Sequence, residues 1–211
     1  ESMKLIQIPV GFELQLFASE PQIVNPMAMC WDEKGRLYVI ETEDYPNEVR
    51  TEGGNDRIKI LEDTDGDGKA DKVTVFAEGL NIPTSIMAMN GGILISMAPD
   101  FVFLKDTDGD DKADVREVLI TGWGKSDTHA GPSNLKYGYD NNIWGVLGYS
   151  GFKGTVGGQE FNFSQGVYRF APDASNFEFL GSTSNNTWGL GFSEDFNVFI
   201  STANGQHSAY L

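Results

Sequence analysis

A nine-residue acidic segment occurs twice in this chain, and its carboxylates are spaced as the ligands of a hard cation would be. The two copies are DTDGDGKAD at residues 63–71 and DTDGDDKAD at residues 106–114. Aspartates at every second position of a tightly turning loop direct oxygen atoms inward, and Ca²⁺ needs six or more such ligands. The segments therefore predict two calcium sites. The alternative is a pair of solvated acidic turns that hold no ion.

Each segment aligns with the loop of an EF-hand, whose odd-numbered positions supply oxygen ligands. In the first copy the predicted ligands are Asp63, Asp65, Asp67, the backbone carbonyl of Lys69, and Asp71. In the second copy they are Asp106, Asp108, Asp110, the carbonyl of Lys112, Asp114, and Glu117 at the twelfth position. Asp111 stands where a glycine is usual in such a loop. Carboxylates that converge without a cation would repel one another, and this favours ion binding.

The chain has only two histidines, and each lies in a loop of small polar residues beside an apolar hairpin. His129 comes just before the hairpin that begins at residue 134, and His207 follows the apolar run 197–201. Imidazole is the side chain best suited to take up a proton near neutral pH. His129 is therefore the candidate catalytic base. In the alternative interpretation, each histidine is only a hydrogen-bonded loop residue.

The elements that would hold these residues are short strands. Four units of apolar strand, polar turn and apolar strand have turns that begin near residues 32, 90, 140 and 193. This repeat of about 50 residues is the size of one four-stranded propeller blade. The sequence thus predicts an all-β fold, a β-propeller of four-stranded blades.

The number of hairpins predicts three and a half to four blades. We expect residues 1–211 to form a single β-propeller domain that is the N-terminal part of a larger propeller. The acidic segments are expected to join the outer strands of consecutive blades at the rim, where an ion would be structural. Loops next to the innermost strands meet at the mouth of the central channel, so we expect His129 and His207 to face one pocket there, with Tyr149 nearby.

Composition limits the partners and the cellular location. The net charge of −16 argues against nucleic acid and anionic membrane surfaces. No apolar run approaches the length of a membrane span, so direct membrane insertion is not expected. A lone cysteine, Cys30, excludes an internal disulfide bond and a CxxCH haem attachment. Because millimolar calcium occurs outside the cytoplasm, the acidic segments favour an extracytoplasmic (periplasmic or secreted) protein.

Several stretches resemble known families. His129-Ala130-Gly131 and the run 134–144 resemble the PQQ-dependent glucose/sorbosone dehydrogenases. A resemblance to the N-terminal propeller of the planctomycete-type membrane-bound dehydrogenase-like proteins, which are often fused to a c-type cytochrome, covers nearly the whole chain. The residues that carry it are GFELQLFASEP at 11–21, the two DTDGD segments, DTHAG at 127–131 and STANG at 201–205.

The resemblance implies a six-bladed propeller that binds pyrroloquinoline quinone (PQQ) and oxidises a sugar or alcohol. His129 matches the catalytic base, which takes the hydroxyl proton while hydride passes to the quinone. Asn134 stands where those dehydrogenases usually have arginine, and with His207 and Tyr149 it is a candidate cofactor-binding residue. A cytochrome c domain or protein would accept the electrons. The alternative function is a non-catalytic extracytoplasmic propeller that binds carbohydrate or a protein partner, with structural calcium loops.

Overall fold

Each apolar hairpin of the sequence forms the inner half of a small antiparallel sheet. The computed structural model describes residues 2–47 and 49–211. The first sheet has the order β1 (Pro26–Trp31), β2 (Leu37–Glu41), β3 (Asp56–Glu62) and β4 (Lys72–Leu80). The second has the order β5 (Ser85–Met89), β6 (Gly92–Met97), β7 (Asp100–Lys105) and β8 (Val115–Thr121). Both sheets therefore have the up-and-down strand order of a propeller blade.

The third and fourth sheets follow the same plan with two differences. The third consists of β9 (Pro132–Tyr137), β10 (Ile143–Leu147), β13 (Gly166–Phe170) and β14 (Phe177–Gly181). A separate hairpin, β11 (Phe152–Val156) and β12 (Gln159–Phe163), is inserted between its second and third strands. The fourth sheet has three strands, β15 (Thr187–Phe192), β16 (Val198–Thr202) and β17 (Ala209–Tyr210). The inserted hairpin was not predicted.

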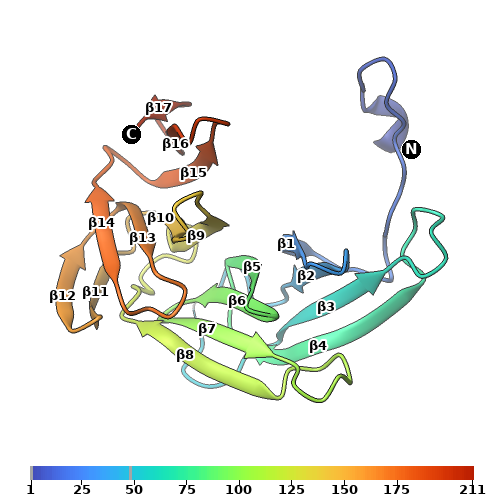
Figure 1. The fold of residues 1–211 in the computed structure, drawn as a ribbon, viewed down its shortest axis with the longest axis horizontal. Helices are drawn as coiled ribbons and strands as arrows, with labels where there is room; N and C mark the ends of the chain where they lie inside the picture. Colours follow the sequence, from blue (N-terminus) through green and yellow to red (C-terminus); the bar gives the residue numbers. More distant parts are fainter. Residues whose placement is uncertain (1, 48) are drawn as a thin grey trace.

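The blades follow one another along an arc, with β1 and β5 on its inner side and β4 and β8 on its outer side (Figure 1). The first strands of neighbouring blades lie in contact, β1 with β5, β5 with β9, and β9 with β15. The predicted propeller of four-stranded blades is thus confirmed. A single 3₁₀ turn, η1 (Ser2–Leu5), precedes the sheets, and no helix of the described residues is long and apolar enough to cross a membrane.

Apolar clusters between the blades form the core. Tyr38 and Ile60 of the first blade pack with Ile86 and Ile93 of the second. Between the second and third blades, Trp123 stacks on Phe101 with ring centroids 4.4 Å apart and also contacts Phe152 of the inserted hairpin. These buried rings hold the blades at fixed positions relative to one another, and so fix the loops that connect them.

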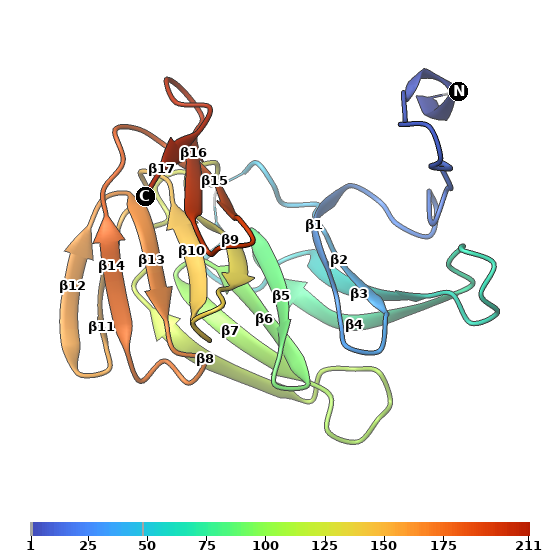
Figure 2. The same cartoon turned by 45° about the horizontal axis from the view of Figure 1, so that its top comes forward.

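Each acidic segment lies in a loop that connects two strands of the same blade. Residues 63–71 connect β3 to β4, and residues 106–114 connect β7 to β8, so the prediction that they join consecutive blades is wrong. Both loops project beyond the ends of their strands (Figure 2). The third and fourth strands of the first two blades are paired and are connected by the acidic loops. The chain passes from one blade to the next through the crossovers 81–84, 122–131 and 182–186.

Candidate functional site

A cleft of about 530 Å³ lies along the first strands of the four blades. It is lined by residues of β1, β5, β9 and β15, together with Tyr45 of the β2–β3 loop and Thr128, His129 and Gly131 of the crossover between the second and third blades. Its volume is in the range of small-molecule and cofactor sites. The cleft therefore brings the four blades and several of their connecting loops to one surface.

His129 lies at this cleft beside a carboxylate. Its Nδ1 is 3.1 Å from Oδ1 of Asp127, and its backbone N–H donates to the same oxygen over 2.8 Å. Because a ring nitrogen next to a carboxylate carries the proton, Nε2 of the neutral ring is left with a free lone pair. The imidazole is 58% exposed, and its centroid is 5.2 Å from that of Tyr45. The arrangement places a proton acceptor at the cleft.

Tyr149 contacts Asp127. Its hydroxyl donates to Oδ2 of Asp127 over 2.7 Å, and Tyr149 is not among the residues that line the cleft. The hydrogen bond from Tyr149, with the one from the His129 backbone, lowers the pKa of Asp127, and the same carboxylate raises the pKa of Tyr149. Tyr149 was predicted as a cofactor-binding residue, and here its hydroxyl is directed to the partner of the candidate base.

The other two candidate cofactor-binding residues lie apart from each other. Asn134 lines the cleft and donates from Nδ2 to the backbone oxygen of Trp188 over 2.5 Å, so it joins the third blade to the fourth. His207 is exposed in the β16–β17 loop, where its Nδ1 is 3.0 Å from Oγ of Ser208. Of the two histidines, the cleft is lined by His129 alone.

Two residues that line the cleft were missed as site residues. Lys136 donates from Nζ to the backbone oxygen of Leu190 over 2.8 Å, which leaves two of its three N–H donors for a ligand. Trp188 also lines the cleft, and its side chain is 55% exposed. Alternation along β9 could have identified Lys136. Successive side chains of a strand point to opposite faces, so Lys136 lies on the same face as Asn134, and Leu135 between them is buried.

Three carboxylates converge in each acidic loop. Ligand oxygens of Asp63, Asp65 and Asp71 lie within 4.8 Å of one another, and so do those of Asp106, Asp108 and Asp114. The backbone N–H groups of Gly66 and Gly68 donate to the two oxygens of Asp63, each over 2.7 Å, and the bond from Gly68 is the largest influence that lowers the pKa of Asp63. Ionised oxygens held this close fit the ligand set of a hard cation.

The remaining predicted ligands lie outside these groups. Asp67 and Asp110 accept the backbone N–H groups of Lys69 and Lys112 over 2.8 and 2.9 Å. Glu117, the predicted twelfth-position ligand, is an exposed residue of β8 paired with Phe103 of β7. The convergence is therefore strongest among the first, third and ninth positions of each loop.

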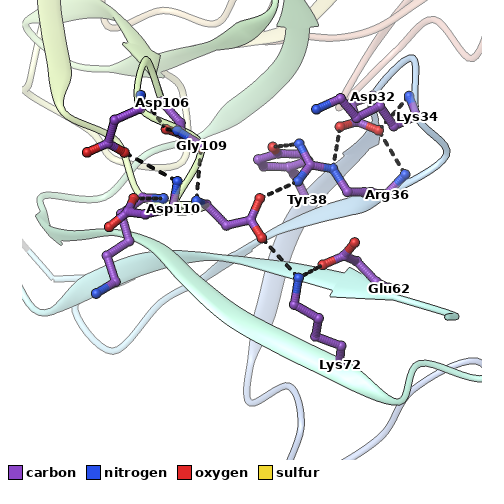
Figure 3. Close-up of polar contacts among 12 residues, drawn as sticks. Asp32, Lys34, Arg36, Tyr38, Glu62, Lys72, Asp106, Gly109 and Asp110 are labelled. Atoms are coloured by element: carbon purple, nitrogen blue, oxygen red, sulfur yellow. Dashed lines mark hydrogen bonds and ion pairs between the residues drawn. The ribbon is translucent and has the colours of Figure 1, made fainter.

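Asp111 links the second acidic loop to the first blade. Its oxygens accept from Nη1 of Arg36 over 2.6 Å and from Nζ of Lys72 over 3.0 Å. Figure 3 shows Arg36 with Asp32 and Tyr38 on the β1–β2 hairpin and Lys72 beside Glu62, close to the loop that carries Asp106 and Asp110. The substitution of the usual glycine by Asp111, at a φ of 64°, supplies this contact between blades.

One family model covers the whole chain. The family model described as "Domain of unknown function (DUF7133)" matches residues 1–211. No curated protein matches the chain.

Among solved structures, the holo form of the PQQ domain of pyranose dehydrogenase from Coprinopsis cinerea is 15% identical, with a TM-score of 0.57 over 90% of this chain and 48% of that one. A putative oxidoreductase (glucose dehydrogenase) from Thermus thermophilus is 13% identical, with a TM-score of 0.56 over 90% of this chain and 62% of that one. A putative gluconolactonase is 13% identical, with a TM-score of 0.55 over 92% of this chain and 63% of that one. This chain thus spans about half to three fifths of their lengths, and at these identities the similarity shows a shared propeller fold.

Proposed function

This chain belongs to the DUF7133 family, and we propose that it forms part of a quinone-dependent dehydrogenase that oxidises a sugar or alcohol. The observation that carries the proposal is the pairing of His129 with Asp127 at a cleft of about 530 Å³. Proton removal from a hydroxyl needs a base within reach of the substrate and a group that orients the base. His129 and Asp127 meet both requirements, because the Asp127 carboxylate holds Nδ1 and leaves Nε2 to accept the proton.

The cleft also fits a planar, anionic quinone such as PQQ. Lys136 offers N–H donors to a carboxylate, and the rings of Trp188 and Tyr45 border the cleft as flat surfaces. The amide oxygen of Asn134 remains an acceptor, since only its Nδ2 is used in the contact with Trp188. When bound, the quinone would supply the hydride acceptor. The chain's own residues orient substrate and cofactor and take up the proton.

We propose that each acidic loop binds a Ca²⁺ ion with a structural role. The convergence of Asp63, Asp65 and Asp71, repeated at the second loop, supports this assignment. An ion that binds only the folded state stabilises it. Millimolar calcium outside the cytoplasm is consistent with an extracytoplasmic protein, and a cytochrome c domain or protein is the proposed electron acceptor.

Oxidation of a panel of sugars and alcohols by the intact protein tests the proposal. The assay supplies PQQ and Ca²⁺ and follows reduction of an artificial dye. Dye reduction that depends on both substrate and PQQ would support the proposed function. Absence of dye reduction across the panel would contradict it. Carbohydrate binding without turnover would then favour the alternative, a non-catalytic binding propeller.

A further inference from the structure

The hydroxyl of Tyr149 points at Asp127, which is itself the partner of His129. We infer that Tyr149 is a positioning residue: it fixes the carboxylate of Asp127 so that His129 keeps its proton on Nδ1 and presents Nε2 to the cleft. This inference rests on the proposed function, because the choice of ring nitrogen matters only where His129 accepts a substrate proton.

The two oxygens of Asp127 have separate tasks. Oδ1 accepts both the backbone N–H and Nδ1 of His129, whereas Oδ2 accepts the Tyr149 hydroxyl over 2.7 Å. Rotation of the carboxylate about its Cβ–Cγ bond would break these contacts together. Without the Tyr149 hydrogen bond, Oδ2 would have no protein donor among the described residues, and the carboxylate could turn away from the imidazole ring.

The backbone around Tyr149 is joined to the backbone around Asp127. The N–H of Gly124 donates to the Gly151 oxygen over 2.7 Å, and the Ser150 N–H donates to the Ala130 oxygen over 3.2 Å. The Ser150 hydroxyl donates to the backbone oxygen of Asp127 over 2.7 Å. The β10–β11 turn therefore runs beside the loop of His129 and brings the Tyr149 hydroxyl to a defined position.

The direction of the hydroxyl separates this role from cofactor binding. Tyr149 is 49% exposed and does not line the cleft, while His129 does. The hydrogen bond from Tyr149 is also the largest influence that lowers the pKa of Asp127, so it favours the ionised carboxylate that the Nδ1–H group needs as an acceptor. The position of the Tyr149 hydroxyl and its effect on the charge of Asp127 therefore both favour a proton on Nδ1 of His129.

Nitrogen NMR of ¹⁵N-histidine-labelled intact protein tests the inference without cofactor or substrate. The His129 signals are assigned by their loss in His129→Gln, and spectra are recorded at a pH where the rings are neutral. We expect the wild type to hold His129 mainly as the Nδ1–H tautomer. Tyr149→Phe, which removes only the hydroxyl, should lower the ratio of Nδ1–H to Nε2–H by about tenfold. An unchanged ratio in Tyr149→Phe would overturn the inference.

Tyr139→Phe is the matched control. Tyr139 is an exposed tyrosine in the β9–β10 turn, at the opposite ends of the strands from the β10–β11 turn, and we expect its variant to keep the wild-type tautomer ratio. A change in Tyr139→Phe equal to that in Tyr149→Phe would count against a specific role of the Tyr149 hydroxyl.

Turnover is a second, separate readout. In a protein that oxidises its substrate, Tyr149→Phe should lower kcat about tenfold and leave KM unchanged, because the base and not the substrate contact is disturbed. An unchanged kcat would overturn the inference while leaving the proposed function intact. A tautomer ratio that responds to Tyr149→Phe in a protein without turnover would support the positioning of the ring by Tyr149 and contradict the proposed function.

Discussion

Arg36 and Asp111 are 75 positions apart in the sequence, yet Nη1 of Arg36 donates to Oδ1 of Asp111 over 2.6 Å at the boundary between the first two blades. Lys72 of β4 binds the other carboxylate oxygen. The side chains of Arg36 and Asp111 are only 16% and 23% exposed, so solvent screens this pair less than an open surface pair. The second acidic loop is therefore attached to the neighbouring blade through a residue that is not one of its predicted ligands.

Replacement of Asp111 by Asn should weaken this attachment. Asn tolerates the positive φ of this position, so the change removes charge without adding backbone strain. We expect the free energy of unfolding to fall by about 1 kcal/mol, measured by urea denaturation. The control is Glu43→Gln, which removes the 57%-exposed partner of Arg57 and should change stability by less than about 0.5 kcal/mol. Equal effects of the two variants would contradict a special role for Asp111.

The effect of Asp111→Asn should also depend on pH. Lys72 and Arg36 hold the pKa of Asp111 below its ordinary value. A carboxylate with a lowered pKa in the folded state stabilises the protein above its unfolded-state pKa of about 4, and this contribution is lost as pH falls through the folded-state value. The stability difference between wild type and Asp111→Asn should therefore be constant above about pH 5 and shrink below about pH 4. A difference that grows towards acid pH would contradict the assignment.

Calcium should stabilise the chain through both acidic loops. At a free Ca²⁺ concentration of about 100 times Kd, one site adds about 2.7 kcal/mol. Thermal unfolding in Ca²⁺ and in chelator should differ, and Asp65→Asn or Asp108→Asn should each remove part of the difference, because each belongs to a converging group. Asp195→Asn, an exposed aspartate of the β15–β16 turn, is the control. Identical melting in Ca²⁺ and chelator would contradict calcium binding.

Gly148 allows the β10–β11 turn to lie against the loop of His129. A Cβ at this position would lie 2.6 Å from Cα of Ala130. Gly148→Ala should therefore lower the free energy of unfolding by about 1–3 kcal/mol, measured in urea, and displace the His129 loop. Gly181→Ala has open space around its Cβ and should change stability far less. If both variants unfold at the same urea concentration, the close approach does not constrain the loop.

The strands could be predicted because their signals are local. Alternating apolar residues and a two-residue Asn90-Gly91 turn, both at positive φ, define the β5–β6 hairpin. The β11–β12 hairpin carried a similar signal in Gly157-Gly158, but it interrupts the four-strand repeat, and so it was missed. Repeat length predicts how many strands a blade has, and says nothing of an insertion between two of them.

The contacts of the site could be predicted only between residues that are close together in the sequence. Asp127 and His129 are two positions apart, and the same loop holds both. The contact of Tyr149 with Asp127 depends on the path of the β10–β11 turn, and that of Arg36 with Asp111 depends on how two blades pack. Such packing cannot be predicted from sequence spacing or from residue type.

The most direct test of the proposed function is the kcat of His129→Ala in dye-linked oxidation by the intact protein with PQQ and Ca²⁺. Loss of a general base costs about 10²–10⁴-fold in rate. We predict that kcat falls at least about 100-fold while PQQ still binds, because His129 is exposed at the cleft and its removal leaves the blades intact. Oxidation by His129→Ala at the wild-type rate would contradict the assignment of His129 as the base.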